Sequence, residues 1–234
     1  DTSSYCTNLA REIMEEIIPY LGIERAPIEE EENLKLYARM KFQVFYSDVS
    51  YMESHSNSEY TIYVKKDVEE DIEYRFLHEF FHCVQYETGF PQLTAIDDKY
   101  KELATSISSL ILDLNIRERL ENNGYYQDIK YIKRSVKEVT KLLKMIQQFR
   151  DKTEMSSFED FIDLAGIMLT SDFANVKNNE LRVIIRKTRP VALRYYETFN
   201  TCIKLYSYSN VDGVNKIFQY LLNELELSSF MKIK

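Results

Sequence analysis

Apolar residues recur along this chain at two different periods, which predicts two kinds of secondary structure. Residues 4–21 carry apolar side chains at three- and four-residue steps, which is typical of an amphipathic helix. Apolar, β-branched and aromatic residues then alternate with more polar ones at 41–47 and 59–65, which predicts two strands. The polar residues 54–58 between them indicate a turn, so we expect a hairpin or small sheet.

After residue 66 the helical period takes over. Helices are predicted at 69–88, 94–120, 126–150, 157–170, 180–187, 190–208 and 211–227. Gly89 is placed for a left-handed cap at the end of the first of these helices, and Thr94 with Asp97 for the start of the second. We therefore expect an α+β, mostly helical fold: a core at 1–124 that contains the small sheet, and a helical region at 125–234 that can pack into the same domain.

Composition and charge narrow the class of protein. The 234 residues are 44% hydrophobic and carry a formal net charge of −8. A chain of this size and composition can bury a substantial core, whereas its acidity argues against nucleic acid as a partner. The basic residues Lys130, Lys133, Arg134 and Lys137 recur at helical spacing, which is typical of a solvated helix face.

Cysteine usage and hydropathy bear on the compartment. Cys6, Cys83 and Cys202 are widely separated and odd in number, which favours a reducing, cytoplasmic location over a disulfide framework. No run of eighteen apolar residues predicts a membrane span. The chain starts at Asp1 without a methionine, which is compatible with a removed leader or a truncation.

The most specific motif is His78-Glu79-Phe80-Phe81-His82, within the predicted helix 69–88. Residues four apart share a face of a helix, so both imidazoles can reach one cation. Glu79 lies beside them and can contact a water bound to that cation. Since these are two of only three histidines in the chain, we predict a metal site with His78 and His82 as ligands.

A hydrolytic zinc site needs a third protein ligand. We expect Glu102, twenty residues after His82, to supply it from the next helix. It lies at the edge of an apolar stripe and beside small polar side chains that would permit a close approach of the two helices; the stripe is Leu103, Ile107, Leu110, Ile111 and Leu114, and the small residues are Thr105, Ser106 and Ser109. Asp97, Asp98 and Glu87 are the alternatives.

This arrangement, over residues 40–115, resembles the gluzincin class of zinc metallopeptidases, including thermolysin-like enzymes and the compact ImmA/IrrE-type peptidases. The resemblance implies a zincin-like core with one zinc ion held by His78, His82 and Glu102, and Glu79 as the general base. It also implies that the 59–65 strand is an edge strand to which an extended substrate adds. Ser106 departs from the pattern, since thermolysin-like enzymes have an Asp four residues after the ligand Glu.

The resemblance implies a metallopeptidase that hydrolyses peptide bonds in a protein or peptide substrate. His55, Tyr125 and Tyr126 are the candidates for stabilising the oxyanion. Two alternatives remain: a catalytically inactive zincin-like module for metal binding or protein interaction, and a helical scaffold with an accidental motif. The C-terminal helices would offer a surface for a regulatory partner or for self-association, and no membrane partner is expected.

Overall fold

The computed structural model describes residues 36–65, 72–122, 124–125, 129–149 and 158–234. The predicted helix at 4–21 and Tyr126 lie outside these residues. The described elements, in chain order, are β1 (Lys41–Ser47), β2 (Tyr51–Ser54), β3 (Glu59–Lys65), α3 (Ile72–Glu87), β4 (Leu93–Ala95), the 3-10 helix η1 (Asp98–Tyr100), α4 (Lys101–Asn122), α5 (Ile129–Phe149), α6 (Phe158–Phe173), α7 (Asn179–Thr188), α8 (Pro190–Leu205), α9 (Val211–Glu224) and β5 (Met231–Ile233). The prediction of an α+β, mostly helical chain is confirmed.

The chain forms two compact units. The first comprises residues 1–90 and 116–127, and the second comprises 91–115 and 128–234. The predicted limit of the core at residue 124 lies close to the boundary at 127, but 91–115 groups with the helical region instead. Helix α4 is continuous across this division. Its first fifteen residues are counted with the second unit, and Ile116–Asn122 with the first.

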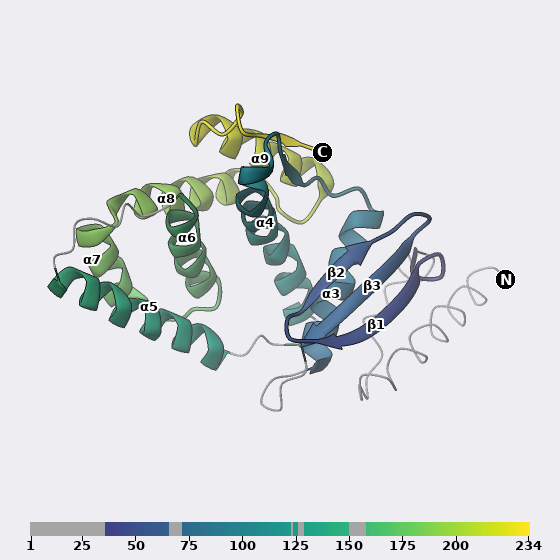
Figure 1. Ribbon diagram of the computed structural model, residues 1–234, viewed down its shortest axis with the longest axis horizontal. Coiled ribbons are helices and arrows are strands. Elements are labelled where there is room, and N and C mark those ends of the chain that lie inside the picture. Colours follow the sequence, from purple (N-terminus) through teal and green to yellow (C-terminus); the bar gives the residue numbers. More distant parts are fainter. Residues whose placement is uncertain (1–35, 66–71, 123, 126–128, 150–157) are drawn as a thin grey trace. The chain divides into compact units, whose positions relative to one another are not determined.

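The sheet of the first unit has the strand order β1-β3-β2, and Figure 1 shows β3 between the other two strands. β2 pairs with β3 antiparallel, as a hairpin, whereas β1 runs parallel to β3. The expectation that the 59–65 strand is an edge strand is wrong for the described sheet. β3 is the most buried of the three, with Tyr60, Ile62 and Val64 at most 2% exposed, and such a strand belongs in the centre.

Helix α3 covers one face of this sheet (Figure 1). Its apolar side contributes the largest part of one core cluster, through Phe76, Leu77, Phe80, Phe81, Cys83 and Val84. These are the residues that helical spacing predicts on one side, and each is at most 2% exposed. Ile116 and Leu120 of α4 belong to the same cluster. The packing therefore ties the end of α4 to α3.

The second unit contains the helices α5 to α9 and a two-stranded sheet in which β4 pairs antiparallel with β5. Helices α5 to α9 begin and end within three residues of their predicted limits, as α5 at Ile129–Phe149 illustrates. The two short strands were not predicted, because three residues are too few to display an alternating pattern. None of the helices in the described ranges is long and apolar enough to span a bilayer.

One glycine and one cap test the predicted helix ends. Gly89, with φ of 77°, follows α3 in the left-handed conformation that its position predicts. Helix α4 begins at Lys101 rather than at 94. Thr94 is drawn into β4, while Asp97 accepts a hydrogen bond from the backbone N–H of Lys99 and caps η1. Asp97 is therefore a helix cap, but it caps η1, which begins later in the chain than the helix predicted from residue 94.

Candidate metal centre

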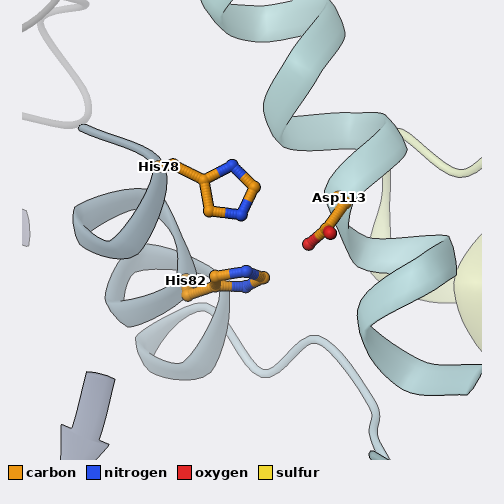
Figure 2. Close-up of side chains that lie close together, drawn as sticks. All are labelled: His78, His82 and Asp113. Carbon is orange, nitrogen blue, oxygen red and sulfur yellow. The ribbon is translucent and has the colours of Figure 1, made fainter. Parts of the chain in front are cut away.

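Helix α3 presents both motif histidines on one side. His78 and His82 are one turn apart, with ring centroids separated by 4.9 Å and ring planes nearly perpendicular. Both side chains are half-buried. Figure 2 shows the two rings one above the other, directed toward the same space. The opposite side of the helix is held in the core of the first unit, so the apolar residues determine which way the imidazoles face.

A hydrogen bond orients the ring of His82. Its Nδ1 lies 3.2 Å from Oε1 of Gln85, one turn further along α3. Because an amide oxygen only accepts, Nδ1 is the donor in this contact, and Nε2 is the nitrogen left for a cation. Histidines that bind metals commonly use their second nitrogen in this way. Gln85 is only 4% exposed, so its side chain has a defined position.

A carboxylate from the neighbouring helix completes the group. Ligand atoms of His78, His82 and Asp113 all lie within 4.8 Å of one another. In Figure 2 the carboxylate of Asp113 on α4 points toward the two imidazoles. Asp113 is half-buried, and its Oδ1 is inaccessible to solvent. This is the group of possible metal ligands that the described part of the chain provides.

Packing at the end of α4 accounts for the position of Asp113. The residue lies one turn before Ile116, which is fully buried in the cluster that α3 dominates. The guanidinium of Arg119 lies 4.5 Å from the ring centroid of Phe81 on α3, which adds a cation–π contact between the two helices. A rigid helix that is fixed at these points also fixes the carboxylate one turn away.

The structure does not bring Glu102 to the imidazoles. Its side chain is exposed in the first turn of α4, and the acid beside the histidines is Asp113. Eleven residues separate the two acids, which is about three turns and about 16 Å along the axis, so they share a face but cannot bind the same ion. Helical spacing thus places the expected ligand on the same face of α4 as Asp113, but about three turns away from it.

The other acids considered from the sequence have different contacts. Glu87 accepts a hydrogen bond from the hydroxyl of Tyr60. Burial, followed by the proximity of Glu87, raises the pKa of Tyr60. Asp97 caps η1, and Asp98 is exposed there. None of the three belongs to the group around the imidazoles within the described residues.

Glu79, the candidate general base, directly follows His78 in the sequence. It is buried, with 8% of its surface exposed. Its backbone carbonyl accepts a hydrogen bond from the thiol of Cys83, at 3.4 Å. Burial raises the pKa of Cys83, and the charge of Glu79 adds to the shift. A protonated, fully buried thiol is a core residue and not a metal ligand, as the sequence predicts.

The donor set fits zinc. Two imidazoles and one carboxylate are the protein ligands of many catalytic zinc sites, in which the fourth position is open. Bonds of about 2.05 Å at tetrahedral angles place such ligand atoms about 3.4 Å apart. The ligand atoms of the group lie within 4.8 Å of one another, which is somewhat wider than that spacing but close enough for one ion to face all three. The residues present therefore fit one zinc ion.

Two of the three proposed oxyanion donors, His55 and Tyr125, have contacts elsewhere. His55 lies in the loop between β2 and β3, and its Nε2 is 2.9 Å from the hydroxyl oxygen of Thr61 on β3. Tyr125 is partly buried against the core cluster of the first unit. Neither residue belongs to the group of possible metal ligands among the described residues.

Comparison with known proteins adds no relative. No protein-family model matches the sequence, and neither a curated protein nor a solved structure matches the chain at a significant level.

Proposed function

We propose that this protein is a zinc-dependent metallopeptidase that hydrolyses peptide bonds. The observation that supports the proposal most is the convergence of His78, His82 and Asp113, whose ligand atoms lie within 4.8 Å of one another. A second support is the position of Glu79 within the helical motif, directly after the first ligand. A carboxylate in that position is the general base of metallopeptidases with this motif.

Each residue then has a defined role. His78, His82 and Asp113 hold the ion, and Gln85 keeps the tautomer of His82 that leaves Nε2 available. Bound zinc supplies a Lewis acid that polarises a carbonyl and lowers the pKa of water toward about 7. Glu79 accepts the proton of the attacking water and transfers it to the leaving amine. A buried carboxylate suits this role, because few waters compete for it.

The ligand set bears on the resemblance to gluzincins. That class uses Glu as its third ligand, whereas the acid beside these imidazoles is Asp113. The proposal therefore keeps the motif chemistry of a zinc peptidase and replaces Glu102 with Asp113.

The test combines metal analysis with cleavage of a fluorogenic peptide library. We expect the protein to hold one zinc per chain and to cleave peptides. Glu79→Gln should retain the zinc but lose cleavage by a factor of about a hundred or more, because it removes general-base catalysis. Glu87→Gln is the matched control on the same helix, since a Gln can still accept the bond from Tyr60, and its activity should be unchanged.

An inactive zincin-like module is the second candidate. The observation that favours it is that His55 and Tyr125, two of the three oxyanion donors considered, make other contacts. Zinc that stabilises the fold, with no peptide cleaved by the wild type or by either variant, would support this module. Equal cleavage by the wild type and Glu79→Gln would contradict the peptidase mechanism.

A further inference from the structure

Lysine is the most frequent residue type in the lining of a groove between α5 and α7 of the second unit. The volume of the groove is about 460 Å³. The basic residues are Lys133, Lys137, Lys141, Lys144 and Lys177, and all five side chains are exposed. This is notable in a chain with a formal net charge of −8. The sequence alone predicts here only a solvated helix face.

The lysines of α5 form a row. Lys133, Lys137 and Lys144 lie within about 40° of one another around the helix, and Lys141 about 40° further. From the first to the last, the row extends about 16 Å, which is the length of about five residues of extended peptide. The groove thus offers a linear array of positive charge and not a single anion pocket.

Few carboxylates neutralise this array. Helix α5 carries six basic residues and one acid, Glu138, which pairs with Arg134. Lys144 pairs with Glu180 of α7. In the ranges that the structure describes, no ion pair joins Lys133, Lys137, Lys141 or Lys177 to a carboxylate. Four lysines therefore face the groove or its rim without a compensating charge from those ranges.

The floor of the groove is apolar, and its polar groups are already used. Val136, Val176 and Leu181 are buried beneath the lysines. The hydroxyl of Thr140 donates to the carbonyl of Val136, at 2.6 Å. The amide nitrogen of Asn178 donates to Asp172 and Ser171. Recognition here consequently depends on charge and apolar contact.

These features favour an acidic polypeptide over nucleic acid. None of the described residues that line the groove is aromatic, so they offer bases no stacking platform. Arginine, whose planar fork matches phosphate, is also missing from this described part of the lining. Lysines act as point charges, which suits separate carboxylates along an extended chain, and apolar side chains of that chain can contact the floor.

We propose that the groove between α5 and α7 binds an acidic segment of another protein in extended conformation. This interaction surface is distinct from the metal centre and needs no zinc. Under the proposed function it would capture substrates or regulators that carry acidic segments, but the binding itself does not depend on catalysis.

The experiment measures fluorescence anisotropy of a labelled octaglutamate peptide with the full chain, with and without chelator. We expect saturable binding that weakens when NaCl rises from about 0.05 M to about 0.5 M, because the Debye length shortens. The triple variant K133E/K137E/K141E should bind about tenfold or more weakly. The control K204E/K216E/K232E makes the same change in total charge on α8, α9 and β5 and should bind as the wild type does.

Circular dichroism establishes that both variants fold. Equal losses in the two triple variants would reduce the effect to net charge and overturn the proposal. It is also overturned by an absence of saturable binding, or by tighter binding of a single-stranded oligonucleotide or of anionic phospholipid vesicles than of the peptide. Binding that survives the chelator supports the groove even if the zinc peptidase proposal fails.

Discussion

Gln85 determines which nitrogen of His82 is available to a cation. Its carbonyl oxygen accepts from Nδ1–H, and its burial prevents water from replacing it easily. Outer partners of this kind typically change metal affinity about 10–100-fold when they are removed. The contact between Gln85 and His82 should therefore contribute to the affinity for zinc.

Gln85→Leu should lower zinc affinity about 10–100-fold, because the ring of His82 loses its orienting acceptor. Gln85→Glu keeps an acceptor oxygen at the same place and should retain the affinity. Competition with a chromophoric chelator measures both constants. Equal affinities for Gln85→Leu and the wild type would show that the hydrogen bond does not position the ring.

The two candidate acids of α4 can be separated by matched substitutions. Asp113→Asn removes the carboxylate beside the imidazoles, and we expect zinc affinity to fall by a factor of about a hundred or more. Glu102→Gln changes an exposed side chain three turns away and should leave the affinity unchanged. Zinc titration by calorimetry gives both values. A loss in Glu102→Gln alone would restore the ligand expected from the sequence.

Helix geometry explains which part of the candidate metal site can be predicted from the sequence. The spacing of His78 and His82 on one helix constrains both rings, and the structure brings them together. The third acid comes from another helix, whose height relative to α3 depends on tertiary packing that no spacing encodes. A signal for Asp113 was present, because it is an acid between the apolar residues Leu112 and Leu114, both of which are buried.

At the scale of elements, the end of α4 is the part of the fold that the site depends on most. Ile116 is fully buried against α3, one turn from Asp113. Ile116→Ala should lower the free energy of unfolding by about 2–5 kcal/mol, because it leaves a cavity in the core. Urea denaturation measures this loss. Ile129→Ala on α5 is the control, since that side chain is 46% exposed and should cost little.

The helices and strands of the second unit show why some elements can be predicted from the sequence and others cannot. Helices α5 to α9 have long apolar stripes, and the sequence predicts them closely. Strands β4 and β5 have three residues each and exist because they pair with each other across the sequence. Pairing of this kind drew Thr94 into β4 and moved the start of α4 to Lys101. Local preference loses here to long-range contact.

For the whole molecule, zinc should contribute to stability. An ion that binds only the folded state stabilises it by about 2.7 kcal/mol at a hundredfold excess over its Kd. Removal of zinc with a chelator should therefore lower the melting temperature, and added zinc should restore it. In Asp113→Asn the same chelator should have a much smaller effect. An identical shift in that variant would place the stabilising metal elsewhere.

Alkaline pH should destabilise the fold through its buried thiols. Burial raises the pKa of Cys202 to about 12, from 9.0 for an exposed thiol. The protonated form is favoured in the folded state, so the contribution of Cys202 is complete below pH 9 and is lost as the pH rises toward 12. Denaturation of Cys202→Ala across this range should show a shallower decline, and a parallel decline would contradict this cause.

In the proposed site, one zinc ion joins two imidazoles of α3 to a carboxylate of α4. Anomalous diffraction at the zinc edge, from crystals of the zinc-loaded protein, tests it most directly. We expect one strong peak at about 2.0–2.2 Å from nitrogens of His78 and His82 and from an oxygen of Asp113. A peak beside Glu102, or no peak between the imidazoles at full zinc occupancy, would contradict it.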